Sequence, residues 1–176
     1  MAKRAIAFLL LALALVLPAA RGAGEEAPEY QVKAAFLLNF TKFIQWPPDS
    51  FADGSTPLRI CVLGEDPFGG TLNQMVDGET VNGRRLVVEH VRHVSGPQSC
   101  QVLFISLAEE EARGSVPETG PGVLTVGEGD QFLRRGGMIA FTVVNRRVRF
   151  DIQRGTAERA GLRLSSRLLN VARSVK

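Results

Sequence analysis

Short apolar runs alternate with helical patterns along most of the chain. Four runs rich in branched apolar residues predict buried strands, at residues 58–63, 86–91, 102–105 and 123–126. Short helices are predicted between them, at residues 68–75, 109–113 and 130–135. Buried strands that alternate with helices predict an α/β fold, with a single-domain, open and mostly parallel sheet flanked by helices.

A longer helix is predicted from Glu29 to Gln45. It stops at Trp46 because proline follows, and a residue before proline avoids the helical region. On a helical wheel one arc is apolar and predicted to face the core: Val32, Phe36, Leu37, Phe40, Phe43 and Ile44. Leu38 falls in the middle of the polar arc, where it is either an isolated exposed leucine or a contact for a partner.

The C-terminal segment has a different pattern. Met138–Val144 and Arg147–Ile152 are joined at Asn145-Arg146, which predicts an antiparallel hairpin. Apolar and charged residues alternate in its second strand, as is typical of a sheet edge with one wet face. A final docking helix is predicted to begin at Ser165 or Ser166, either of which could cap it. Its inward residues would be Leu164, Leu168, Ala172 and Val175, and its outward residues Arg163, Arg167 and Arg173.

The first 23 residues have the layout of a secretory signal peptide. Lys3 and Arg4 precede an uncharged apolar run from Ala5 to Leu17, and small residues follow it. This run is shorter than the roughly 20 residues that a membrane-spanning helix needs. The alternative is a buried N-terminal helix, which would normally carry a polar face. We therefore expect residues 24–176 to form one periplasmic domain that does not insert directly into the membrane.

Charge is unevenly distributed in the predicted mature chain. Residues 24–145 carry 16 acidic and 9 basic side chains, for a net charge of −7, whereas residues 146–176 carry 9 basic and 2 acidic ones, for a net charge of +7. A basic segment can contact nucleic acid, a membrane surface or an acidic protein. Its arginines are spaced along predicted helices and a strand without exposed aromatic residues. This spacing favours a solvated face or an acidic protein partner, and no nucleic acid.

No group of residues predicts catalysis, a metal or a cofactor. The turn Gly64–Thr71 has the glycine spacing of a phosphate-binding loop but lacks its lysine and carries two acidic residues, which indicates a structural turn. His90 and His93 lack the companions of a zinc site, and no nucleophile elbow accompanies them. Glu109–Glu111 fit an exposed helical run. The sequence therefore predicts a protein that is not an enzyme.

Cys61 and Cys100 are the two cysteines of the chain. Export places them in an oxidising compartment, where an even number of cysteines favours a disulfide. Cys61 lies inside the first predicted strand and Cys100 just before the third, and these strands can be neighbours in an open α/β sheet. The alternative is a pair of buried thiols.

Six segments together resemble the YfiR/HmsC-like family of periplasmic proteins. They occur in the family's order and span nearly the whole mature chain: residues 33–47 (KAAFLLNFTKFIQWP), 60–64 (ICVLG), 100–106 (CQVLFIS), 136–141 (GGMIAF), 148–152 (VRFDI) and 160–169 (AGLRLSSRLL). One segment alone would be a weak signal, whereas six in register are specific.

The resemblance implies a non-enzymatic α/β protein, often a homodimer, that binds the periplasmic domain of an inner-membrane diguanylate cyclase and represses it. The family's cysteine pair falls on Cys61 and Cys100, but a second pair of its best-known member is missing here. Its partner surface maps to the region from Phe141 to Leu168. We expect four exposed contacts there, Asp151, Gln153, Arg154 and Arg159, and expect Phe141 and Phe150 to support that surface from the core. A periplasmic sensor of small ligands is the alternative function, with its site at the carboxyl ends of the strands.

Overall fold

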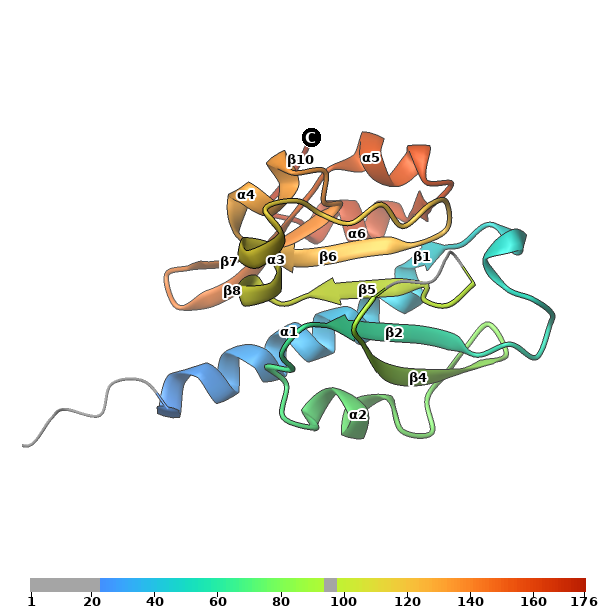
Figure 1. Cartoon of the computed structure of the whole chain (residues 1–176), viewed down its shortest axis with the longest axis horizontal. Helices are drawn as coiled ribbons and strands as arrows, with labels where there is room; N and C mark the ends of the chain where they lie inside the picture. The colour runs from blue at the N-terminus through green and yellow to red at the C-terminus, as the bar shows by residue number, and fades with distance from the viewer. Residues whose placement is uncertain (1–22, 94–97) are drawn as a thin grey trace, which may run out of the picture.

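The computed structural model describes residues 23–93 and 98–176 of the chain. The predicted signal peptide lies outside this part, apart from its last residue. The described part forms a mixed α/β sheet in the order β10-β8-β7-β6-β5-β2-β4-β3, which confirms the predicted fold class (Figure 1). The strands of this sheet are β2 Leu58–Leu63, β3 Thr80–Val81, β4 Arg84–Val91, β5 Val102–Ile105, β6 Leu124–Glu128, β7 Ile139–Val144, β8 Arg147–Ile152 and β10 Ser174–Val175.

The five central strands are parallel and run in the order β4-β2-β5-β6-β7. Counted along the chain this is the 2-1-3-4-5 order of flavodoxin-like sheets. The pair β7 and β8 is antiparallel, as predicted. Its turn residues Asn145 and Arg146 have φ values of 51° and 59°, because a tight two-residue hairpin turn requires the left-handed region.

Helices cover both faces of the sheet (Figure 1). On one face α1 (Ala23–Phe43), α2 (Thr71–Val76) and α6 (Ser166–Val171) pack over the larger hydrophobic core. On the other face lie α3 (Leu107–Arg113) and α4 (Gly129–Arg134), beside a smaller core. Alternate residues of a strand supply the two cores. In β5, for example, Phe104 belongs to the larger core and Leu103 to the smaller one.

Helix α1 is rotated relative to the predicted wheel and begins earlier than predicted. Its buried stripe includes Lys33, Ala34, Leu37 and Phe40, whereas Val32 is 45% exposed. The prediction that Val32 faces the core was therefore wrong. Lys33 takes the inward place because its ammonium group pairs with Glu29, one turn earlier on α1, and with Glu128 at the end of β6. The sequence pattern alone gave no sign of the contact with Glu128.

The C-terminus corrects the predicted last helix. Ser165 caps α6, since its hydroxyl accepts a hydrogen bond from the Leu168 amide at 3.3 Å. The helix ends at Val171, and the chain then forms β10, parallel to β8 at Asp151–Ile152. Val175 therefore lies on a strand and not on the helix. Strand pairing explains the difference. Strand β10 pairs with β8 at Asp151 and Ile152, so β8 forms the edge of the sheet only over its earlier residues.

Several short elements were missed by the sequence analysis. Strand β1 (Ile44–Gln45) pairs antiparallel with β9 (Arg163–Leu164), which places Leu164 on a strand rather than on the predicted last helix. The 3-10 turn η1 (Pro48–Ser50) follows β1, and α5 (Arg154–Arg159) follows β8. These elements span a few residues each, too few for a recognisable period.

Candidate functional site

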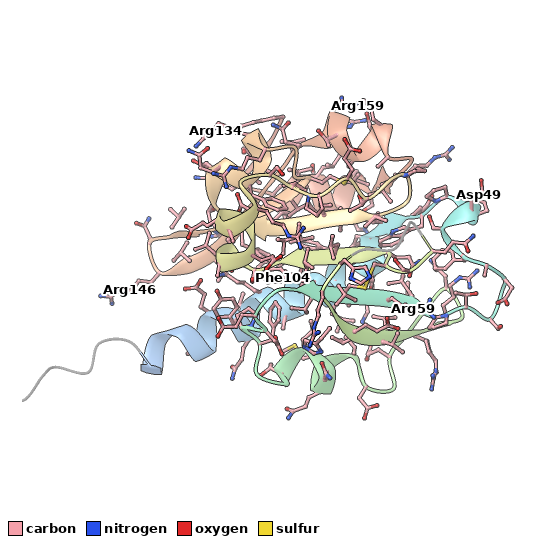
Figure 2. The ribbon with its side chains drawn as sticks, in the orientation of Figure 1. Asp49, Arg59, Phe104, Arg134, Arg146 and Arg159 are labelled. Atoms are coloured by element: carbon pink, nitrogen blue, oxygen red, sulfur yellow. A yellow bond between two sulfur atoms is a disulfide. The ribbon has the colours of Figure 1, made fainter. Side chains whose placement is uncertain are left out.

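The predicted partner residues Arg154 and Arg159 lie on α5 and are exposed. Arg154 Nε donates to Glu158 Oε1 at 2.7 Å, and Arg159 Nη2 donates to Thr156 Oγ1 at 3.1 Å. In Figure 2 Arg159 points away from the body of the protein. Gln153 is half-buried and immediately precedes α5. Both arginines are therefore open to a partner, on a short helix that α5–β9 contacts hold in place.

Asp151 is not exposed, so this part of the prediction was wrong. Its side chain is 1% exposed and accepts hydrogen bonds from Arg173 Nε at 2.8 Å and Ser174 Oγ at 2.7 Å. Burial alone would raise the pKa of the Asp151 carboxyl, but these hydrogen bonds and the charge of Arg173 outweigh it, and the pKa is lowered. Arg173 Nη2 also lies 3.5 Å from Asp130 Oδ1. The four residues form a clasp that ties the C-terminal strand to β8 and α4.

Leu38 is half-buried and packs against the larger core. Phe141 and Phe150 are each 1% exposed, as expected of core residues. Their rings contact Phe36 and Phe40 of α1, with centroid separations of 5.1–6.1 Å. This aromatic cluster fixes α1 against β7 and β8.

A hollow of about 440 Å³ lies at the carboxyl ends of the central strands. Leu107 follows β5, and Glu128 to Asp130 end β6 and begin α4; these two segments form one side of the hollow. The end of β7 and the start of α1 form the other side. The Thr142 Oγ1 atom in its wall is buried, and it has no hydrogen-bond partner among the described residues. In open α/β sheets, ligands bind at this end of the strands.

Lys33 lies in the floor of this hollow with a 1% exposed side chain. Its ammonium group is 2.5 Å from carboxylate oxygens of both Glu29 and Glu128, and 4.2 Å from the centre of the Tyr30 ring. The Tyr30 hydroxyl also donates to Glu128 at 2.9 Å. A buried ammonium needs such compensation because desolvation of an unpaired charge is costly. The cluster joins α1 to the end of β6. The four-residue spacing of Glu29 and Lys33 is typical of a helical ion pair, but no local sequence pattern indicated Glu128.

A second buried carboxylate lies on the other face of the sheet. Glu110 of α3 is 1% exposed, and its Oε1 accepts from Arg135 Nη1 at 2.9 Å. Within the described residues its Oε2 has no partner. Burial raises the pKa of the Glu110 carboxyl, and the hydrogen bond and charge of Arg135 offset only part of that increase.

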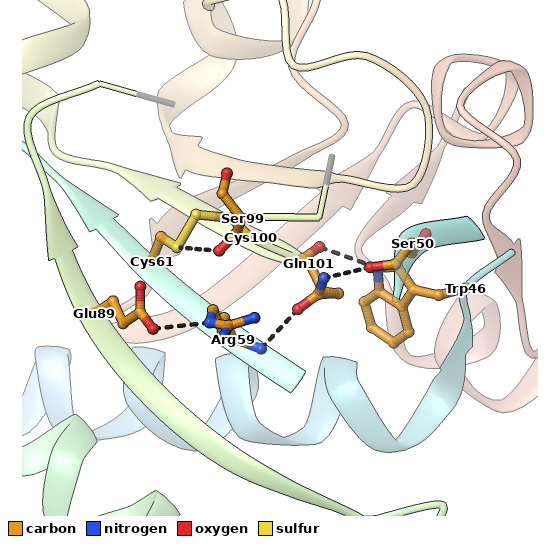
Figure 3. The surroundings of a disulfide bond; sticks show 8 residues. All are labelled: Trp46, Ser50, Arg59, Cys61, Glu89, Ser99, Cys100 and Gln101. Carbon is orange, nitrogen blue, oxygen red and sulfur yellow. Dashed lines mark hydrogen bonds and ion pairs between the residues drawn. A yellow bond between two sulfur atoms is a disulfide. The ribbon is translucent and has the colours of Figure 1, made fainter. Parts of the chain in front are cut away.

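The predicted disulfide is present. Cys61 and Cys100 are bonded, with their Cα atoms 5.9 Å apart, and they lie on the neighbouring strands β2 and β5 or just before them (Figure 3). Both are buried, with exposed fractions of 0% and 1%. Next to the bond, the buried Gln101 side chain donates to Ser50 O at 2.7 Å and accepts from the Arg59 amide at 2.8 Å. This region is a structural anchor for η1.

The remaining candidates are dispersed. His90 Nε2 lies 3.1 Å from Asp66 Oδ2 at an exposed site, and His93 is exposed. Gly64 has φ +89°, and a Cβ there would lie 2.5 Å from Ser106 Oγ, so the turn lies directly against the start of α3. In residues 23–93 and 98–176 no three potential metal ligands form a group. Nor does any helix there have the length and apolarity to cross a membrane.

The fold and the site together define an α/β domain with a buried charged clasp, an open hollow and a short helix that exposes two arginines. The chain belongs to the YfiR/HmsC-like family, whose model matches residues 30–173. Members of this family are periplasmic, non-catalytic regulators of cyclic-di-GMP signalling. The chain is also similar to the crystal structure of a conserved domain protein from Vibrio cholerae O1 biovar El Tor, with a TM-score of 0.42 and 10% identity. The match covers 84% of this chain and 60% of that protein.

Proposed function

We propose that this chain is a periplasmic repressor that binds the periplasmic domain of an inner-membrane diguanylate cyclase. Repression lowers cyclic-di-GMP and limits biofilm formation. The family match over residues 30–173 is the observation that carries this proposal. The exposed arginines of α5 support it, because they offer cationic contacts to a protein partner.

The repressor acts by differential affinity. A ligand shifts a conformational equilibrium only by as much as it prefers one state, so the repressor must bind the inactive arrangement of the cyclase more tightly than the active one. The clasp around Asp151 and the aromatic cluster on the other face of the sheet hold β8 in place directly before α5, and so provide a rigid frame for this contact. Rigidity reduces the ordering cost of binding.

Charge reversal on α5 tests the contact. The double change Arg154→Glu and Arg159→Glu should weaken capture of the cyclase's periplasmic domain and raise cellular cyclic-di-GMP toward the level of a deletion strain. Arg85→Glu is the control, since Arg85 is also exposed but lies on β4, toward the other edge of the sheet. Cyclic-di-GMP that stays at the wild-type level in the deletion strain would refute repression itself.

A sensor of small ligands is the second candidate function, and the hollow at the carboxyl ends of the strands favours it. Thermal-shift screening of the purified protein against envelope metabolites tests this function. Stabilisation by one compound, lost in a variant of the hollow such as Val144→Lys, would support a sensor. If no compound stabilises the protein and the protein captures the cyclase's periplasmic domain, the repressor function is favoured.

A further inference from the structure

Strand β4 has an open edge over most of its length. On one side β2 pairs with it from Leu86 to Val91. On the other side β3 pairs only with Arg84 and Arg85, and the Leu86 amide then donates to the Glu79 carbonyl at 3.0 Å. Beyond that bond, no described residue forms a backbone hydrogen bond to this side of the strand. The edge lies at the opposite end of the sheet from β8 and β10.

Two residues on this edge have free backbone groups. The Leu86 amide points to the β3 side, and bonding direction alternates along a strand. The amide and carbonyl groups of Val88 and His90 therefore point to the same side. In the part of the chain that the structure describes, none of these four groups has a backbone hydrogen-bond partner. A strand placed beside β4 would find two donors and two acceptors along the edge.

A groove of about 410 Å³ lies beside this edge. One wall is α2, which lies next to β4 in Figure 1, and the other wall is β4 itself. The β4 wall is aliphatic, and the full lining is Asn73, Gln74, Val76, Asp77, Leu86, Val87 and Val88. Domains that bind an extended peptide at an open strand edge gain affinity from main-chain hydrogen bonds and specificity from pockets for alternate side chains. An open edge next to a groove offers both.

Charge indicates which peptide fits the groove. Asp77 is exposed at the end of α2 and takes part in no ion pair with the other described residues. Residues 65–91, which include both walls, carry five acidic and two basic side chains. Of the two basic ones, Arg84 is held by two backbone carbonyls at 2.7 Å. Arg85 lies on the face of the sheet opposite to Leu86 and α2, because side chains alternate along a strand. A basic side chain in the groove therefore has an unpaired carboxylate to meet.

We propose that the groove between α2 and β4 binds an extended, basic segment of a protein partner. The segment adds a strand to the edge at Val88 and His90, and its alternate aliphatic side chains enter the groove. A lysine or arginine of the segment pairs with Asp77. This surface lies at the opposite edge of the sheet from β8, which leads into α5, so the proposal does not depend on the cyclase contact.

The probe is a blocked synthetic peptide in which lysine and valine alternate, and the control peptide has glutamate in place of each lysine. Amide nitrogen–proton correlation spectra of the purified exported protein follow the binding. The amide signals of Val88 and His90 should shift in a saturable way with the lysine peptide. The glutamate peptide should bind roughly tenfold more weakly, because its charges repel Asp77 instead of pairing with it.

A proline substitution tests the backbone contact. Val88→Pro removes the outward amide without touching the pairing with β2, and should abolish binding of the lysine peptide. Val148→Pro is the matched control, because Val148 is also a half-buried valine on an edge strand. The Arg173 amide donates to the Phe150 carbonyl on the outer side of β8, so alternation directs the Val148 amide outward as well. The control variant should bind the lysine peptide as the wild type does.

Charge exchange at Asp77 provides a second test if a proline variant unfolds. Asp77→Lys should reverse the preference, so that the glutamate peptide binds more tightly than the lysine peptide. Glu111→Lys is the control, since Glu111 is exposed on α3, on the other face of the sheet, and this variant should keep the wild-type preference.

Several results would overturn the proposal. They are equal affinity for the two peptides, no saturable binding at millimolar concentration, and unchanged binding by folded Val88→Pro protein. Shifts at Val88 and His90 that grow with protein concentration alone would also overturn it, because a second copy of the chain would then occupy the edge.

Discussion

Removing the guanidinium of Arg173 should destabilise the protein more than neutralising the carboxylate of Asp151. In Arg173→Met the 1% exposed carboxylate keeps only the hydrogen bond from Ser174. Breaking a fully buried ion pair lowers the free energy of unfolding by roughly 3–5 kcal/mol. Arg173 is 42% exposed, so water already screens this pair, and we expect a loss of about 2 kcal/mol from the unpaired Asp151. In Asp151→Asn the remaining Arg173 can turn to water, so the cost is about 1 kcal/mol.

Urea-induced equilibrium unfolding measures the free energy of unfolding of both single variants. The double variant Arg173→Met with Asp151→Asn should be less destabilised than Arg173→Met alone. The pH dependence gives a second readout. The pKa of Asp151 is lowered in the folded state, so its contribution is present above the unfolded value of about 3.9 and is lost as pH falls through the folded value. Wild type should therefore lose more stability than Asp151→Asn on acidification below about pH 4. If Asp151→Asn is the less stable of the two single variants at neutral pH, the reasoning about burial is wrong.

Three further perturbations test other contacts. Replacing both cysteines of the disulfide with alanine should lower the free energy of unfolding by roughly 4 kcal/mol, measured in urea, because the bond closes a loop of 39 residues. Lys33→Met should cost about 2 kcal/mol, because half-buried Glu128 loses its cation and keeps only the hydrogen bond from Tyr30, and adding Glu128→Gln should recover part of the loss in thermal melts. Gly127→Ala places a Cβ 2.3 Å from the Phe132 ring and should cost about 1–3 kcal/mol, a loss that Phe132→Leu should reduce and that an unchanged melting temperature would contradict.

Much of the fold follows from local sequence. The runs that form β2 and β5 are apolar on both faces, as strands covered by helices on both sides must be. The junction of two strand patterns at Asn145-Arg146 predicted the hairpin, and Asn145 is one of the few residue types that readily adopt a positive φ. Ser165 was one of the two residues expected to cap the last helix. The disulfide was expected because export places the cysteines in an oxidising compartment and because their strands can be neighbours in the sheet.

The candidate site could be predicted only in part. Arg154 and Arg159 are exposed, as expected of residues on a polar segment. Asp151 was expected to be exposed because it alternates with apolar neighbours on β8, but the Arg173 side chain returns from beyond α6 to cover it. Alternation gives the face of a strand on which a residue lies, and not what packs over that face.

The sequence by itself therefore determined the class of fold, the longer strands, the hairpin and the family. The tertiary structure alone decided which charges are buried, where the last helix ends and which strand edge stays open. The physical reason is the range of the interactions. Backbone preference and apolar periodicity act between near neighbours, whereas the burial of Lys33 depends on Glu128, 95 residues away, and the course of residues 172–175 depends on pairing with β8.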